Sequence, residues 1–151
     1  MARYQKLKIV CDATCHIAEA HLSGRAKKGK SACGILFLDE YGNIVEELSF
    51  YLGELTPPQA EYSGLIKALD EAAAFCRGKI EVWLDSEFVV RQLNGDYGIK
   101  SENMKPLYDQ VKILEKRFLG GVFYFHHPRT ATYAKQAHKL ANKELNEKLG
   151  L

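Results

Sequence analysis

Apolar residues recur along this chain with two spacings, one typical of strands and one typical of helices. Short β-rich runs closed by turn residues predict strands over residues 7–14, 31–39, 44–51, 80–84 and 121–126. Apolar residues three or four positions apart predict helices over residues 59–77, from Ser86 onward, over 101–118 and over 130–149. This order indicates an α/β fold, with a mixed sheet and helices on its faces.

The helix over residues 59–77 has the most regular apolar stripe. Pro57 and Pro58 precede it, where a missing N–H costs nothing, and Gly78 follows as a stop signal. The tyrosine–glycine–asparagine turn at residues 41–43 predicts an antiparallel hairpin between the second and third strands. We expect the aromatic residues around the fourth and fifth strands to lie in the core, namely Trp83, Tyr124 and Phe125.

Three acids stand where separate elements could bring them together. Asp12 lies near the end of the first strand, Glu61 lies in the first turn of the long helix, and Asp85 follows the fourth strand. Each has a structural alternative, because acids also cap helices and favour their first turns. Three converging carboxylates would repel one another without a cation, which argues for hard metal ions such as Mg²⁺. Two such ions roughly 4 Å apart form a clamp for phosphodiester cleavage.

Composition places few limits on this reading. The chain has 151 residues, of which 46% are hydrophobic and 26% charged, and we expect a single domain over residues 1–151. The net charge of +2 is compatible with a nucleic-acid partner but does not by itself indicate one. The four cysteines show no zinc-like spacing and are expected as free thiols in a reducing cytosol. Without a signal peptide or an apolar run of about 20 residues, we expect a cytoplasmic protein with no membrane partner.

The residues around the three acids resemble a known family. The strings AEYSGL at residues 60–65 and LDSEFVVRQLNG at residues 84–95, together with Asp12 on the first strand, are similar to type 1 ribonuclease H. The resemblance runs from about Lys8 to Leu145. It implies a ribonuclease H-like fold with a five-stranded mixed sheet, and hydrolysis of the RNA strand of RNA/DNA hybrids by two Mg²⁺ or Mn²⁺ ions. Asp12, Glu61 and Asp85 match three of the family's four catalytic carboxylates.

The chain departs from the family at several positions. His138 stands where the fourth acid is expected, and Asn142, one turn further, is an alternative neutral ligand. Thr14 belongs to a segment that replaces a glycine-rich turn and is a candidate substrate contact. Pro57-Pro58 replaces the polar pair that often precedes the helix glutamate in the family, and prolines offer no side-chain donors. We therefore expect Gln59 to make the contacts to the minor groove of the hybrid. The segment over residues 94–101 is short, so the basic protrusion of some members is missing.

Basic residues outside the acid cluster are candidates for phosphate contacts. They are Lys27, Lys28, Lys30, Lys100, Lys105 and Arg129. His126 and His127, near the site end of the fifth strand, are candidates for an auxiliary role in product release that some family members give to a histidine on the following loop. The sequence therefore predicts a monomeric, metal-dependent endoribonuclease. Two alternatives stay open: a protein that binds hybrid or double-stranded RNA with weak or lost catalysis, and a resolvase-like nuclease.

Overall fold

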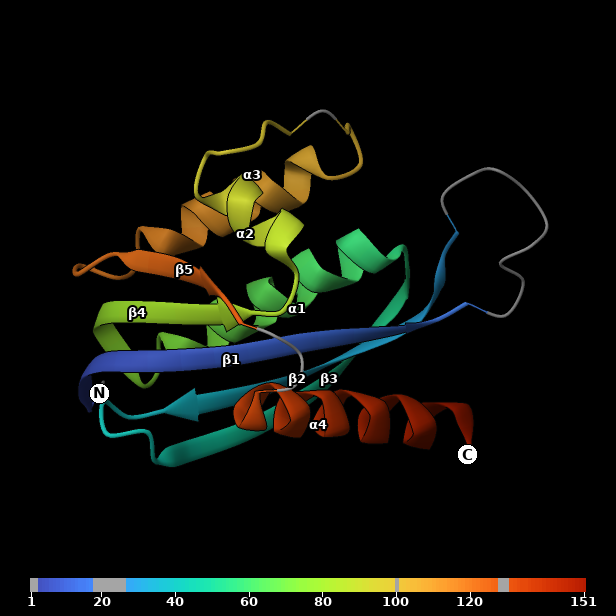
Figure 1. The fold of residues 1–151 in the computed structure, drawn as a ribbon, viewed down its shortest axis with the longest axis horizontal. Helices are drawn as coiled ribbons and strands as arrows, with labels where there is room; N and C mark the ends of the chain where they lie inside the picture. The colour runs from blue at the N-terminus through green and yellow to red at the C-terminus, as the bar shows by residue number, and fades with distance from the viewer. Residues whose placement is uncertain (1–2, 18–26, 100, 128–130) are drawn as a thin grey trace.

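The chain folds into one mixed sheet with helices on both faces, as seen in a computed structural model that describes residues 3–17, 27–99, 101–127 and 131–151 (Figure 1). The strands are β1 (Tyr4–His16), β2 (Gly29–Leu38), β3 (Ile44–Leu55), β4 (Cys76–Leu84) and β5 (Val122–His126). The helices are α1 (Pro57–Ala72), α2 (Glu87–Leu93), α3 (Lys105–Glu115) and α4 (Thr132–Leu149).

The five strands are arranged in the order β3-β2-β1-β4-β5. β1 pairs antiparallel with β2, and β2 pairs antiparallel with β3, which confirms the predicted hairpin. β1 and β4, and β4 and β5, run parallel. The carboxyl ends of β1, β4 and β5 therefore meet at one edge of the sheet, where the ligands of open α/β sheets bind.

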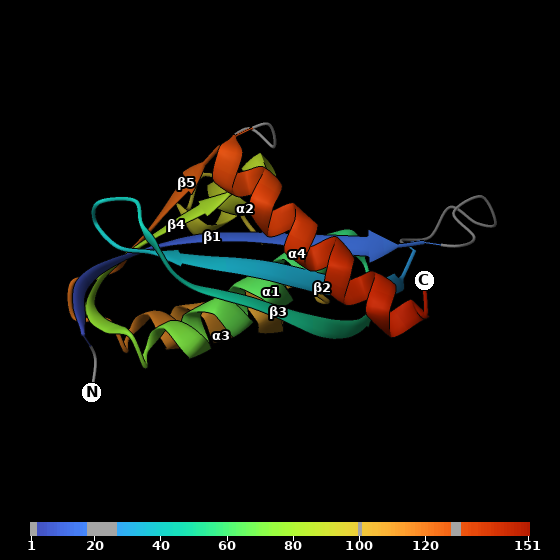
Figure 2. The same ribbon diagram turned by 90° about the horizontal axis from the view of Figure 1, so that it is seen from below.

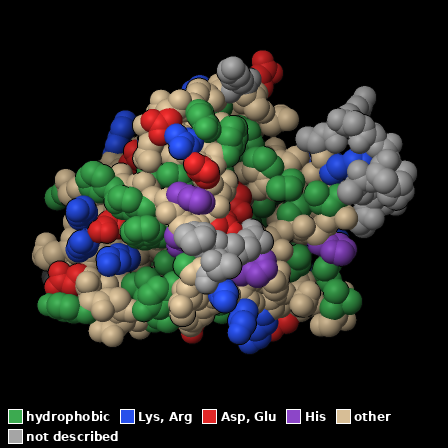
Figure 3. Space-filling model, viewed as in Figure 1, with side chains coloured by type: hydrophobic (Ala, Val, Ile, Leu, Met, Phe, Trp, Pro, Cys, Tyr) green, Lys and Arg blue, Asp and Glu red, His purple; other side chains and the backbone are tan. Residues whose placement is uncertain are grey.

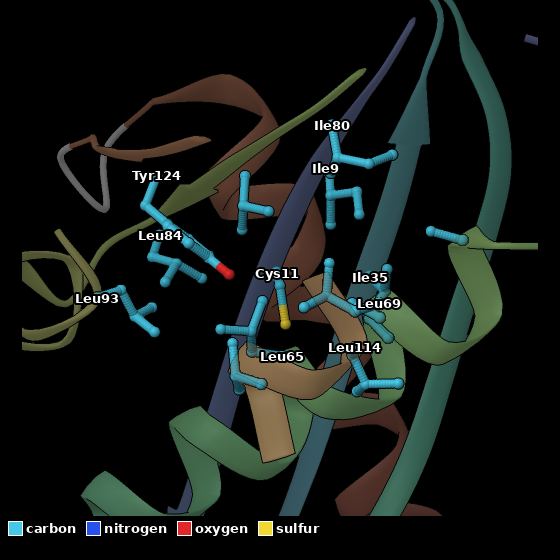
Figure 4. Packing of buried hydrophobic residues seen from close by; sticks show 14 of the residues in the cluster. Ile9, Cys11, Ile35, Leu65, Leu69, Ile80, Leu84, Leu93, Leu114 and Tyr124 are labelled. Atoms are coloured by element: carbon cyan, nitrogen blue, oxygen red, sulfur yellow. The ribbon is translucent and has the colours of Figure 1, made fainter. Parts of the chain in front are cut away.

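The helices divide between the two faces of the sheet. α1 and α3 lie on one face, and α4 lies on the other (Figure 2). Side chains alternate along β1, so that Ile9 and Cys11 join the core under α1, whereas Val10 packs under α4 with Leu36 and Ala137. Figure 4 shows the larger core, in which Cys11 of β1 lies close to Leu65 of α1. The sequence prediction of helices on both faces is confirmed.

Several predicted boundaries are wrong. α1 ends at Ala72 and not at Arg77, and Gly78 lies inside β4. A Cβ atom on Gly78 would stand 2.1 Å from the carbonyl oxygen of Gln5, so this glycine permits close approach of the backbones and does not stop a helix. α3 begins at Lys105, after turns that include Ser101.

The cysteines are free thiols in this structure, as predicted. Cys11, Cys33 and Cys76 are buried, and Cys15 is partly buried. Burial raises the pKa of the Cys33 thiol to about 12, so this group stays protonated at neutral pH. No helix among the described residues is long and apolar enough to cross a membrane.

Candidate active site

Three carboxylates meet where β4 ends. Asp12 comes from β1, Glu61 from α1, and Asp85 from the residue after β4, and one oxygen of each lies within 4.8 Å of the other two. The pairing of Val10 with Trp83 explains the first contact, because two residues further along these parallel strands Asp12 and Asp85 are neighbours. The sequence prediction that these acids converge is confirmed.

The local structure shows whether Asp85 is needed as a helix cap and whether Glu61 is an acid of a helix first turn. Ser86 is the N-cap of α2, and its hydroxyl accepts a hydrogen bond from the backbone N–H of Val89, so Asp85 is not needed as a cap. A capping box between Thr56 and Gln59 starts α1 at Pro57. Glu61 therefore lies beyond the first turn of α1, contrary to the sequence prediction, where the helix dipole favours an acid less.

Two glycines let the helices approach the sheet at the acids. A Cβ atom on Gly34, which pairs with Asp12, would stand 2.1 Å from the carbonyl oxygen of Ala137 in α4. A Cβ atom on Gly64 would stand 3.0 Å from Cβ of Cys33. Because no side chain intervenes at Gly34, α4 lies against the sheet one residue before His138.

His138 lies directly beside Asp12. Its Nδ1 atom is 2.6 Å from Oδ2 of Asp12, and Nδ2 of Asn142 is 3.0 Å from its Nε2 atom. If the Asn142 amide donates to Nε2, the ring carries its proton on Nδ1 and donates it to Asp12. Both candidates for the fourth position thus form one hydrogen-bonded chain that ends on Asp12.

The cluster has the donor set of a hard-cation site. Its ligands are carboxylate oxygens, which Mg²⁺ and Mn²⁺ prefer, and Asp12 is only 3% exposed. The acids also act on the nearby thiol of Cys11. Burial raises the pKa of Cys11 most, the neighbouring Cys33 raises it further, and the negative charges of Glu61, Asp12 and Asp85 add to the rise. The Cys11 thiol is therefore protonated at neutral pH and adds no charge beside the acids.

The predicted substrate contacts are spread around this centre. Thr14 lies partly buried in β1, two residues beyond Asp12, and Gln59 uses its side-chain oxygen in the α1 capping box. Lys28 and Lys30 are exposed. Lys105 forms an exposed ion pair of 2.6 Å with Asp109. Lys100 and Arg129 lie outside the described residues.

One depression opens at the acids, and a second depression shares part of its lining. The first, of about 410 Å³, is lined by Glu61 and Asp85 together with Pro57, Pro58 and Phe88. The second, of about 880 Å³, shares those two prolines and Phe88 and continues past Tyr97 and Lys27. The exposed rings of Phe88 and Tyr97, with centroids 5.7 Å apart, were not identified as site residues from the sequence, although Phe88 lies in the LDSEFVVRQLNG string and Tyr97 follows it closely.

The two histidines at the end of β5 have different surroundings. Nε2 of His126 is 3.2 Å from the carbonyl oxygen of Asp85, and the ring is exposed. His127 is buried, and its backbone N–H donates to the carbonyl of Leu84. Burial lowers the pKa of His127, His126 lowers it further, and the charge of Asp85 opposes the change. His126 is therefore the histidine with access to the acid cluster from solvent.

Comparison with known proteins gives a consistent picture. Residues 21–144 match the reverse transcriptase-like family. Over 103 residues, or 68% of the chain, the sequence is 29% identical to a bifunctional protein of Mycobacterium tuberculosis, of which it spans 28%. Over 128 residues, or 83% of the chain, it is 30% identical to ribonuclease HI of Halobacterium salinarum, of which it spans 61%. The matched segments thus span less than two thirds of the length of these relatives.

Solved structures of type 1 ribonucleases H also superimpose on this chain. An RNase H1 solved in complex with an RNA/DNA hybrid superimposes with a TM-score of 0.78 at 27% identity, over 95% of this chain and 99% of that one. The ribonuclease H-like fold and the resemblance inferred from the sequence are confirmed. The chain therefore belongs to the reverse transcriptase-like family, and within it is similar in sequence and in fold to the type 1 ribonucleases H.

Proposed function

We propose that this protein is an endoribonuclease that hydrolyses the RNA strand of RNA/DNA hybrids with divalent metal ions. The observation that carries the proposal is the cluster of Asp12, Glu61 and Asp85, whose oxygens lie within 4.8 Å of one another at the carboxyl edge of the sheet. The similarity to ribonuclease HI and to an RNase H1 bound to a hybrid supports the choice of substrate.

The three carboxylates would hold Mg²⁺ or Mn²⁺, two ions in the full complex. Ions bound there would activate a water molecule and stabilise the leaving oxygen, as two-metal phosphodiester hydrolysis requires. The protein's own part is to orient its ligands. β1 and the end of β4 fix Asp12 and Asp85 on neighbouring strands, α1 brings Glu61 from the opposite layer, and His138 hydrogen-bonds to one oxygen of Asp12.

The depressions beside the acids give room for a two-stranded substrate. The smaller one contains Glu61 and Asp85, and the larger one extends past the rings of Phe88 and Tyr97. We propose that the RNA strand lies over the acids and that the second strand follows the larger depression. Gln59, Lys27 and Lys28 would contact the backbones, with Lys100 and Arg129 as further candidates.

A cleavage assay tests the proposal. A labelled RNA/DNA hybrid, a duplex RNA and a branched DNA are incubated with the wild type and with Asp85→Asn, each in Mg²⁺ and in Mn²⁺. We expect cleavage of the RNA in the hybrid alone, and a loss of at least about a hundredfold in the variant, as for removal of a group that stabilises a transition state. Equal cleavage by both proteins would indicate a contaminating nuclease and end the proposal.

A second function follows from His138, which carries no negative charge where the resemblance to type 1 ribonuclease H implies an acid. Without that charge a second cation is held less tightly. The protein would then bind hybrid or double-stranded RNA with weak or lost catalysis. This alternative predicts salt-sensitive binding of hybrid and no cleavage in either metal ion. If the enzyme is active, Mn²⁺ should support it better than Mg²⁺, because Mn²⁺ tolerates imidazole ligands more readily.

A further inference from the structure

The sheet face that carries α4 is only partly covered. α4 packs on β1, β2 and β3. Beside it, on β5, the ring of Phe123 is 45% exposed and the ring of Phe125 is 39% exposed. The sequence prediction that Phe125 belongs to the core is wrong, because the helix that would bury it stops short of the strands at this edge. Figure 3 shows hydrophobic side chains interspersed with Lys and Arg side chains over β1, β4 and β5.

These rings are aligned with the candidate active site. Phe125 pairs with Trp83, and Phe123 pairs with Glu81, so all four side chains project to the same face. Asp85 lies two residues beyond Trp83 on that strand, and therefore continues the same row of side chains. A polymer held at the acids that continues along β4 would pass Trp83 and Phe125 first, and Phe123 roughly 7 Å further on.

The chemistry of the surface suits unpaired nucleotides. The Trp83 and Phe125 rings stack on each other, with centroids 4.8 Å apart and an interplanar angle of 24°, so the pair forms an aromatic stack across β4 and β5 that a base could extend at its outer face. Nζ of Lys79 lies 5.1 Å from the centroid of the Phe123 ring. Exposed rings on a sheet, flanked by cations, bind bases by stacking and phosphates by charge.

Charge favours a nucleic acid over a protein partner. Lys6, Lys8 and Lys79 surround the rings in the paired rows of β1 and β4, whereas the one acid among them, Glu81, forms an ion pair of 3.0 Å with Lys6. The surface therefore has an excess of positive charge, next to a site for which a nucleic-acid substrate is proposed. A purely apolar partner surface would offer these lysines no opposite charge, whereas the phosphates of a nucleic acid do.

We propose that Trp83, Phe123 and Phe125, with Lys8 and Lys79, form an aromatic face that binds unpaired nucleotides of a strand extending beyond the hybrid. The position of the hybrid in this inference rests on the proposed function, whereas the binding of single strands does not depend on it. It gives the protein a second contact with its substrate, outside the acids and the depressions around Phe88. Hybrids with a single-stranded extension would then be preferred to blunt hybrids.

Intrinsic fluorescence tests the aromatic face directly, because Trp83 is the chain's one tryptophan. The protein is titrated with single-stranded oligouridylate at low and at moderate salt. We expect quenching that weakens as salt rises, and an apparent affinity at least roughly fivefold lower in Phe123→Leu, the lower limit for loss of one base stack. Leucine keeps the apolar bulk on β5, so the variant is expected to fold. Tyr41→Ala, at an exposed ring between β2 and β3, is the matched control.

A second measurement separates this inference from the proposed function. The wild type and Phe123→Leu are compared on a blunt hybrid and on hybrids with an RNA extension at either end. We expect one extension to lower KM severalfold in the wild type, and this advantage to disappear in the variant. Quenching that depends on Phe123 without any hybrid cleavage would overturn the proposed function and leave the aromatic face in place.

Two results would overturn the aromatic face itself. One is that oligouridylate does not quench the Trp83 fluorescence, or quenches it equally in the wild type and in Phe123→Leu, whether or not hybrid is cleaved. The other is a protein that sediments as an oligomer and becomes a monomer in Phe123→Leu with no change in oligouridylate binding, because the rings would then be an interface between copies of the chain.

Discussion

Nδ1 of His138 lies 2.6 Å from Oδ2 of Asp12, so the candidate for the fourth position contacts one of the three clustered acids. Asn142 lies on the other side of the same ring, 3.0 Å from Nε2. A hydrogen-bond partner of this kind fixes the orientation of a carboxylate that is a candidate metal ligand. His138 can therefore serve the site through Asp12 even where it holds no cation itself.

Replacing His138 by the acid that the family pattern expects should strengthen cation binding. We expect His138→Asp to raise activity in Mg²⁺ at least about fivefold, the factor for roughly 1 kcal/mol of attraction between unit charges 4 Å apart in water. The ratio of Mn²⁺ to Mg²⁺ activity should fall as well. Metal-dependent cleavage rates of the hybrid measure both. His138→Ala is the comparison, and it should lose about tenfold or more through the freed Asp12.

The opposite result would be equally informative. If His138→Asp and His138→Ala lose activity alike in both metal ions, the hydrogen bond to Asp12 is what matters and an added charge does not help. In that case Asn142→Ala, which leaves the ring in place but removes its second partner, should show a smaller loss of the same kind.

The close approach of α4 to the sheet depends on Gly34. A methyl group there would stand 2.1 Å from the carbonyl oxygen of Ala137, so α4 must shift away from β2. We expect Gly34→Ala to lower the free energy of unfolding by about 1–3 kcal/mol. Hybrid cleavage should fall as well, because the shift separates His138 from Asp12. Urea unfolding and the cleavage assay measure the two effects.

Gly98→Ala is the matched control, because a Cβ atom there has no neighbour within 4 Å. It should change the free energy of unfolding by less than about 0.5 kcal/mol, as surface substitutions do. Equal losses of stability in the two variants would show that the approach of α4 is not what Gly34 provides.

The sequence predicted the parts of this fold that depend on local pattern. Each strand and helix was found, and the three acids converge because each stands at the end of an element or on its site-facing side. The end of α1 was missed for a physical reason. Residues 73–76 continue the apolar period of the helix, but Cys76 already belongs to β4, so periodicity could not locate the boundary.

Features that depend on contacts between distant elements could not be predicted. The exposure of Phe125 is set by how far α4 extends across the sheet, and an alternating aromatic strand does not reveal this. The contact of His138 with Asp12 depends on Gly34, 104 positions earlier in the chain than His138 and on another strand. Sequence spacing indicated which residues belong near the site, but not which of them touch.

A buried hydrogen bond links α1 to α2, one residue after Glu61 in the chain. The hydroxyl of Tyr62 donates to Oε1 of Gln92 over 2.8 Å, and both side chains are buried. We expect Tyr62→Phe to lower the free energy of unfolding by about 1–3 kcal/mol, because the amide oxygen loses its partner without regaining water. The double variant Tyr62→Phe/Gln92→Leu should recover part of this loss. Chemical denaturation of Tyr62→Phe, Gln92→Leu, the double variant and the wild type gives the coupling energy. A double variant that is less stable by the full sum of the two single losses would argue against the bond.

His127 should make the stability of the protein sensitive to acid. Its pKa is lowered in the folded protein, chiefly by burial and further by His126, with Asp85 opposing. As pH falls, the unfolded chain therefore takes up a proton on this ring first, so the stabilising contribution is complete above about pH 6.5 and is lost as pH falls through the folded-state pKa.

The thermal unfolding midpoint at pH 7.5 and at pH 5 measures this effect. The fall in midpoint between the two should be smaller in His127→Gln, which cannot take up the proton, than in the wild type. His16→Gln, at an exposed histidine near the end of β1, should retain the wild-type dependence. If His127→Gln and the wild type lose the same number of degrees, the buried ring does not couple protonation to unfolding, and the acid sensitivity belongs to the carboxylates instead.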